Sequence, residues 1–178
     1  MTTVQLAQPV VAGSATCLVV DDEPGVRGFL IRMLQSQGFQ CFEASSGLEA
    51  LGVLDQIGEP PLIVSDMRMP EMDGIEFLEV VRRRYPDTSV IMLSGMSETS
   101  IAVDCLHRGA ADFLLKPISM GELQARVTRA LEKRALVLQN RFYQENLERQ
   151  VHEQAVRIQE LFLQGVQMLA RALEAKDS

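Results

Sequence analysis

The sequence predicts an α/β domain of five parallel strands alternating with helices, followed by a long helical extension. Five short apolar runs are each followed by a polar loop and, in turn, by apolar residues at helical spacing, which is the pattern of repeated βαβ units. In the last third, no proline follows Pro117 and Gly165 is the only glycine after Gly121, so nothing there interrupts a helix. The expected parts are a loose leader at residues 1–15, a domain at 16–135 and a helical coiled-coil stalk at 136–178.

The composition limits the class of protein. Of 178 residues, 47% are hydrophobic, enough for a folded core, and the net charge of −7 argues against a general nucleic-acid-binding surface. No apolar run approaches the length that spans a bilayer, and the first fifteen residues lack the basic and apolar regions of a secretion signal. Cys17, Cys41 and Cys105 are widely spaced, and neither His107 nor His152 has metal-ligand neighbours. We expect a cytoplasmic protein with reduced cysteines, no zinc site and no direct binding to nucleic acid or membrane.

The first two strands and helices are expected before residue 58. The first strand is predicted at residues 17–20, Pro24 suits the first turn of the following helix, and Gly38 ends that helix. Residues 40–44 form the second predicted strand, and a second helical pattern follows a Ser-Ser-Gly stretch. The apolar residues at helical spacing are Val26, Phe29, Leu30, Met33 and Leu34 in the first helix, and Leu48, Ala50, Leu51 and Leu54 in the second.

The third strand carries the residue around which the chain is organised. The apolar run 62–64 is of the kind that is buried on both faces of a sheet, and it leads into Asp66. A loop rich in Pro and Gly follows, then a helix from Ile75 to about Arg84, which Asp73 is better placed to cap than Asp66. Asp66 is therefore expected at the carboxyl end of a central strand, where open α/β sheets bind ligands.

The fourth and fifth strands also end on polar residues. Residues 90–93 are predicted to form a strand that ends at Ser94, and residues 112–115 form one that ends at Lys116. The intervening helix is closed by Gly109. Its apolar residues are Ile101, Val103, Cys105 and Leu106.

The strand ends should meet in one place. With strand order 2-1-3-4-5, the side chains of Asp21, Asp22, Asp66, Ser94 and Lys116 gather at the carboxyl edge of the sheet. Three converging carboxylates repel one another, and a Mg²⁺ ion, which prefers oxygen ligands, would relieve that repulsion. The central carboxylate could act as a nucleophile and become an aspartyl phosphate, with the lysine and the serine contacting phosphoryl oxygens.

Each of these residues alone has an ordinary explanation. Asp21 and Asp22 could be an acidic cap at a helix N-terminus, Ser94 could be a turn residue, and Lys116 could be solvated. Only their joint placement at four strand ends favours the site.

Residues from about 16 to 135 resemble the receiver domain of two-component response regulators. Four motifs carry the resemblance, and it is their order and spacing that make them specific. They are Val-Val-Asp-Asp-Glu-Pro at 19–24, Ser-Asp-Met-Arg-Met-Pro-Glu-Met-Asp-Gly at 65–74, Val-Ile-Met-Leu-Ser at 90–94 and Asp-Phe-Leu-Leu-Lys-Pro at 112–117. The resemblance implies a flavodoxin-like (βα)5 fold and a phosphorylation-activated switch rather than an enzyme.

The resemblance also implies a role for each site residue. Asp66 would be the phosphoacceptor, and its phosphoryl group would come from a sensor histidine kinase. The implied Mg²⁺ ligands are Asp21, Asp22, Asp66 and the backbone carbonyl of Arg68. The implied phosphoryl contacts are Ser94 and Lys116, the switch pair is Ser94 and Phe113, and the cis peptide is Lys116–Pro117.

Three positions depart from the family or vary within it. Gly95 stands where the family mostly has alanine, and Arg68 and Met96 flank the phosphoryl site at positions that tend to set phosphoryl lifetime. A rival function is an aspartyl-phosphate phosphatase, but that class usually needs a second Asp where this chain has Arg68. Another rival is a dimerisation adaptor that never switches, which would not need the complete set of phosphorylation residues.

The stalk carries an apolar stripe that predicts a homodimer. A heptad register places Gln154 and Gly165 in the seam, whereas an eleven-residue register is apolar throughout, which favours a straight or slightly right-handed coil. The residues of that register are Leu147, Val151, Ala155, Ile158, Phe162, Val166, Leu169 and Leu173.

The end of the stalk resembles a narrower family. Residues 164–177, Gln-Gly-Val-Gln-Met-Leu-Ala-Arg-Ala-Leu-Glu-Ala-Lys-Asp, look like the segment that opens HD-GYP domains, which are metal-dependent phosphodiesterases for cyclic di-GMP. The chain stops at Ser178, before any HD or GYP motif, so we expect a truncated protein or a regulator that keeps only the stalk. Any amphipathic helix rich in Ala, Leu and Glu would give a similar pattern.

Overall fold

The computed structural model describes residues 15–95 and 99–176, with side chains described except at 99–102, 169–170 and 172–176. Most of the expected leader, and Met96, therefore lie outside the described residues. The contacts within the chain divide it into two units, Met1–Ala135 and Leu136–Ser178.

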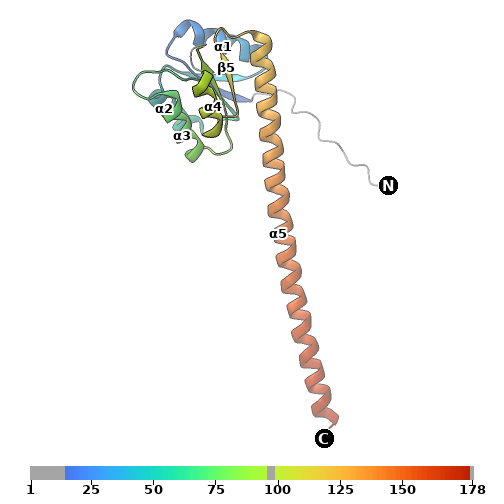
Figure 1. Cartoon of the computed structure of the whole chain (residues 1–178). Coiled ribbons are helices and arrows are strands. Elements are labelled where there is room, and N and C mark those ends of the chain that lie inside the picture. The colour runs from blue at the N-terminus through green and yellow to red at the C-terminus, as the bar shows by residue number, and fades with distance from the viewer. Residues whose placement is uncertain (1–14, 96–98, 177–178) are drawn as a thin grey trace, which may run out of the picture. The chain divides into compact units, whose positions relative to one another are not determined.

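The first unit contains a five-stranded parallel sheet with strand order β2-β1-β3-β4-β5 (Figure 1). This confirms the predicted α/β class and strand order. The strands are β1 (Thr16–Val20), β2 (Gln40–Ala44), β3 (Leu62–Asp66), β4 (Ser89–Ser94) and β5 (Asp112–Leu115). The helices are α1 (Pro24–Ser36), α2 (Gly47–Ile57), α3 (Gly74–Arg84), α4 (Thr99–His107) and α5 (Met120–Lys176).

Helices cover both faces of the sheet, so the central strands lie in the core. On one face, α2, α3 and α4 pack against alternate residues of the strands, and on the other face α1 and the first turns of α5 do so (Figure 1). Every residue of β3 and of β4 is buried. This burial explains why both strands appear in the sequence as continuous apolar runs rather than as alternating patterns.

Side-chain caps fix where three of the helices begin. The Ser46 side chain accepts a hydrogen bond from the backbone of α2, and Asp73 forms a reciprocal capping box with Glu76 at the start of α3. At the start of α5, the Glu122 amide donates to the Ser119 hydroxyl, at 3.3 Å. Because Asp73 caps α3, the carboxylate of Asp66 is left for another use.

Several residues that follow the helical period are nevertheless exposed. Phe29, Leu48, Val103 and Leu106 are between 39% and 52% exposed. The apolar stripe on each of these helices is wider than the strip that the sheet covers, so the residues at its margin remain in contact with solvent.

The beginning of α5 belongs to the core of the first unit. Leu123, Val127 and Ala130 are buried, and the Ser89 hydroxyl donates to the backbone carbonyl of Ala130. These contacts hold α5 against the beginning of β4.

The second unit consists of the remainder of α5. The predicted seam residues whose side chains are described, Leu147, Val151, Ala155, Ile158, Phe162 and Val166, are all exposed in the single chain. The side chains of Leu169 and Leu173 lie outside the described residues. Within the described part of the chain, no helix is both long enough and apolar enough to cross a membrane.

Candidate functional site

An acidic cluster lies at the carboxyl edge of the sheet. Asp21 and Asp22 directly follow β1, and Asp66 ends the neighbouring strand β3, because Val20 pairs with Ser65. One carboxylate oxygen from each of the three residues lies within 4.8 Å of the other two. Asp21 is fully buried, Asp66 is nearly so and Asp22 is exposed, so the cluster opens to solvent on one side.

A lysine from the far side of β4 completes this cluster. The Lys116 ammonium lies 3.0 Å from Oδ2 of Asp21 and 2.9 Å from Oδ1 of Asp66. The backbone N–H of Lys116 donates to the Ser94 carbonyl at 2.8 Å, which holds Lys116 beside the end of β4. The peptide bond between Lys116 and Pro117 is cis. Strand ends that are distant in the sequence thus meet in one ion-paired group.

The charges in this group are unevenly compensated. Burial raises the pKa of Asp66, and the nearby Asp21 carboxylate adds to the rise, although the ion pair with Lys116 opposes it. Burial would lower the pKa of Lys116, but hydrogen bonds to Asp66 and Asp21 outweigh burial and raise it. The single ammonium is shared between two carboxylates, so its ion pair with Asp66 does not cancel the effect of burial on the pKa of that carboxyl.

The two predicted switch residues lie on adjacent strands. Ser94 is fully buried at the end of β4, one residue beyond the Leu93 that pairs with Asp66, and its hydroxyl donates to the Gly95 carbonyl at 3.2 Å. Phe113 is partly buried on β5 and packs against the core cluster that includes α3 and α4.

The loop between β3 and α3 is closed at its base by Gly74. The Gly74 N–H donates to the Met67 carbonyl at 2.8 Å. A Cβ at Gly74 would lie 2.8 Å from the Cα of Met67 and closer still to the Asp66 carbonyl oxygen. Only glycine therefore lets α3 begin directly beneath the residue that ends β3. Within the loop, Glu71 has a φ of 69°, a strained conformation for a residue with a side chain.

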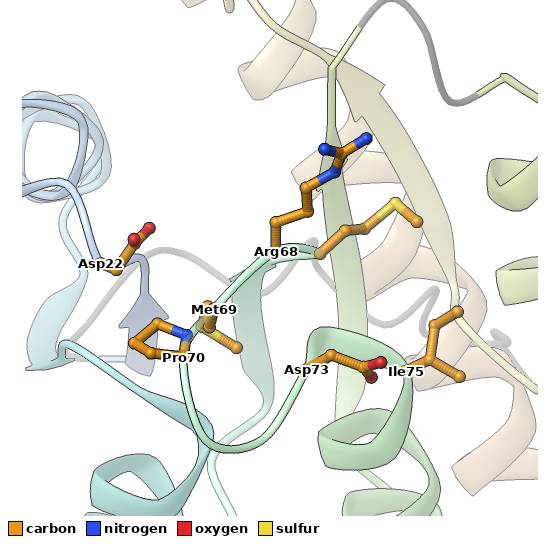
Figure 2. Close-up of a pocket in the computed structure, with 7 residues that line it drawn as sticks. Asp22, Arg68, Met69, Pro70, Asp73 and Ile75 are labelled. Atoms are coloured by element: carbon orange, nitrogen blue, oxygen red, sulfur yellow. The ribbon is translucent and has the colours of Figure 1, made fainter.

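A pocket opens beside the acidic cluster and is formed mainly by this loop. Asp22 lines it on one side (Figure 2). The other lining residues are Met67, Arg68, Met69, Pro70, Asp73 and Ile75. Arg68, which the sequence placed next to the phosphoryl site, lines this pocket and is exposed.

One residue that supports the site was not identified from the sequence. Arg27, on α1, donates from Nη1 to the backbone carbonyl of Asp21 at 2.7 Å and forms an ion pair with Glu43 at 2.9 Å. It therefore holds the loop that carries Asp21 and Asp22. Its position one helical turn after the acidic run could have indicated this contact.

The group of side chains fits a hard divalent cation. Three carboxylates supply the oxygen ligands that Mg²⁺ prefers, and the exposed Asp22 and the adjoining pocket leave room for water or phosphoryl oxygens. The His and Cys ligands typical of zinc do not enter this cluster among the described residues.

Parts of several known proteins are similar in sequence to this chain. The chain is 42% identical over 123 residues to the sensor kinase CckA of Brucella abortus (strain 2308), a match that covers 68% of this chain and 13% of that protein. It is 37% identical over 119 residues to the chemotaxis protein CheY of Listeria monocytogenes, covering 66% of this chain and 96% of CheY. The chain therefore corresponds to nearly all of CheY but to only a small part of CckA.

Solved structures and family models cover the same region. A crystal structure of NtrX from Brucella abortus superimposes with a TM-score of 0.70 at 30% identity, covering 73% of this chain and 29% of that chain. The family model of the response regulator receiver domain matches residues 17–128, which include all four strand ends of the site. The chain belongs to the response regulator receiver domain family.

Proposed function

We propose that this receiver is a phosphorylation switch in which Asp66 accepts a phosphoryl group from a sensor histidine kinase. Receiver domains are generally signalling modules rather than enzymes, and they receive phosphoryl groups from such kinases. The observation that carries the proposal for this chain is the Asp66 carboxylate at the centre of the ion-paired group, 2.9 Å from the Lys116 ammonium.

The residues have distinct roles in the transfer. An oxygen of Asp66 attacks the phosphorus of a phosphohistidine, the phosphorus–nitrogen bond breaks, and the imidazole leaves with the electron pair. The Lys116 ammonium and the Ser94 hydroxyl then contact the phosphoryl oxygens. Asp21, Asp22, Asp66 and the backbone carbonyl of Arg68 would hold Mg²⁺, which supplies positive charge to the transferring group.

The switch follows from recruitment of Ser94. In this structure the Ser94 hydroxyl donates to the Gly95 carbonyl. A dianionic phosphoryl group on Asp66 would attract this hydroxyl away from Gly95, and the shift frees space toward Phe113 on the adjacent strand. We infer that these two residues transmit the change to the surface formed by α4 and β5.

The test is mass spectrometry of the protein incubated with acetyl phosphate and Mg²⁺. One phosphoryl adduct should form on the wild-type protein and none on Asp66→Asn. Asp73→Asn is a matched control, because it alters a carboxylate of the same loop while asparagine still caps α3. An adduct that persists in Asp66→Asn, or that is lost in Asp73→Asn alone, would contradict the assignment.

We further propose that residues 16–135 act through a stalk at 136–178 that pairs with a second copy of the chain. The support is the exposed apolar stripe, in which Ile158 and Phe162 are 67% and 69% exposed. A long helix with such a stripe is unstable in water unless it covers that face. Each seam residue that becomes buried contributes on the order of 1.5–3 kcal/mol, so the stripe can hold a dimer by itself.

Sedimentation equilibrium tests the pairing and its register. Ile158→Asp places a charge in the seam of either register and should dissociate the dimer. Phe162→Asp should do the same if the eleven-residue register holds, whereas its exposed neighbour Leu161→Asp should have a much smaller effect. A fragment of residues 1–139 that stays dimeric without phosphate would show that the stalk is not the main contact.

The output of the switch rests on residues 164–177. We propose that this segment opens an HD-GYP phosphodiesterase domain and that the protein acts in the cytoplasm. Reading the coding sequence beyond Ser178 decides the output: an HD motif and a GYP motif in the continuation support it, and a different domain there refutes it.

A further inference from the structure

Two cysteines face each other on adjacent strands, remote from the phosphorylation site. Cys17 on β1 pairs in register with Cys41 on β2, and their Sγ atoms lie 3.1 Å apart. Both are free thiols, and both lie on the face of the sheet that α1 covers. The third cysteine, Cys105, is buried on the opposite face, so it cannot reach either of them.

We propose that Cys17 and Cys41 form a site of reversible oxidation, which a hydroperoxide converts to an intramolecular disulfide. A disulfide has a sulfur–sulfur distance of about 2.05 Å, so the two sulfur atoms need to approach by only about 1 Å. β2 is an edge strand of the sheet, and an edge strand can shift without disturbing a second neighbour.

The two thiols differ in the way that such a reaction requires. Cys41 is partly exposed, whereas Cys17 is fully buried. The hydrogen bond from the Cys17 thiol lowers the pKa of Cys41, although burial opposes it, and the same hydrogen bond together with burial raises the pKa of Cys17. Because the thiolate is the nucleophile, Cys41 is the residue that attacks and Cys17 is the one that resolves.

The reaction balances in two steps. The Cys41 thiolate attacks one oxygen of the hydroperoxide and the oxygen–oxygen bond breaks, so that Cys41 becomes a sulfenic acid. The alkoxide or hydroxide that leaves takes up the proton that the Cys41 thiol released, and it becomes an alcohol or water. The Cys17 sulfur then attacks the Cys41 sulfur, and the sulfur–oxygen bond breaks. The hydroxide that leaves takes the Cys17 proton to form water. The two thiols lose two electrons and the hydroperoxide gains them.

A disulfide between Cys17 and Cys41 is expected to be labile, because Cys41 is partly exposed and a thiol reductant can approach it. Exposed disulfides are more readily reduced than buried ones, and labile disulfides are the ones that serve regulation. The bond would therefore open again in a reducing compartment, where persistent disulfides are rare.

Peptide mapping under non-reducing conditions tests the proposal. Trypsin places the three cysteines in separate peptides, residues 1–27, 33–68 and 85–108. After treatment of the full chain with hydrogen peroxide, we expect a linked pair of the first two peptides, which dithiothreitol separates. The same link should form in Cys105→Ser and be absent in Cys41→Ser.

Further measurements exclude other products. In Cys17→Ala, Cys41 should accumulate as a sulfenic acid that dimedone traps, because its resolving partner is gone. The proposal is overturned if the link joins the peptide 85–108, if it joins two chains, or if Cys41 is overoxidised while Cys17 stays a free thiol. It is also overturned if both thiols of the folded wild-type protein remain reduced.

Discussion

A series of three glycine-to-alanine changes tests how tightly α3 is placed beneath the end of β3. Gly74→Ala adds a methyl group that would lie 2.8 Å from the Met67 Cα and closer still to the Asp66 carbonyl oxygen. Both neighbours are backbone atoms of the strand end, so they cannot move away by changing a rotamer. Overpacking of this kind costs about 1–3 kcal/mol, and occasionally more. We expect Gly74→Ala to lie at the upper end of that range.

The other two glycines set the scale. A Cβ at Gly52, inside α2, meets nothing within 4 Å, so Gly52→Ala should stabilise the domain by about 0.5–1 kcal/mol through helix propensity. A Cβ at Gly47 would lie 2.9 Å from the Met72 Cγ, but that flexible side chain can turn away. Gly47→Ala should therefore fall between the other two.

Urea unfolding of the whole chain measures the series. The protein has no tryptophan, so pulsed labelling of the buried cysteines, Cys17 and Cys105, reports on the α/β domain without interference from the helical stalk. From the highest urea midpoint to the lowest, the expected order is Gly52→Ala, wild type, Gly47→Ala and Gly74→Ala. A Gly74→Ala midpoint equal to that of the wild type would refute the close approach of α3 to β3.

Three further outcomes follow from other contacts. Burial raises the pKa of Asp66 in the folded protein, so the folded state binds that proton more tightly than the unfolded state does. The folded protein therefore loses stability as pH rises through the folded pKa. Asp66→Asn removes this loss and should raise the urea midpoint at pH 7, and the gain should fade toward acid pH. Arg27→Met removes the hydrogen bond that holds the Asp21 carbonyl and should weaken Mg²⁺ binding in calorimetry by about tenfold, equivalent to about 1.4 kcal/mol, whereas Glu43→Gln removes only an exposed ion pair and should change it little. Leu123→Ala, which empties a fully buried position, should cost about 2–5 kcal/mol in urea unfolding, and Leu136→Ala at an exposed position should cost less than about 0.5 kcal/mol.

The fold could be predicted because each of its determinants is local. Short apolar runs mark the strands that are covered on both faces, and the caps at Ser119 and Asp73 lie beside the helices that they begin. The strand order then follows from the preferred handedness of βαβ crossovers together with the family resemblance.

The site was only partly accessible to the same reasoning. The carboxyl ends of parallel strands lie at one edge of the sheet, and this rule brings Asp21, Asp66 and Lys116 together there. The structure adds the distances from the Lys116 ammonium to the two carboxylates. The rule does not reveal a contact such as that of Arg27, because it depends on the side-chain direction of a helical residue. The helical period also did not show that Phe29 is 41% exposed, because it does not indicate how wide a strip of the helix the sheet covers.

The Lys116 ion pairs have a consequence for which cation the cluster prefers. When ionised, the three carboxylates and the one ammonium leave two negative charges uncompensated. A monovalent cation would leave one of these charges exposed in a partly buried site, whereas a divalent cation makes the group electrically neutral. Valence thus discriminates among ions before coordination geometry does. Replacement of Lys116 by methionine would leave three uncompensated charges, and the preference should then move from Mg²⁺ toward trivalent lanthanide ions.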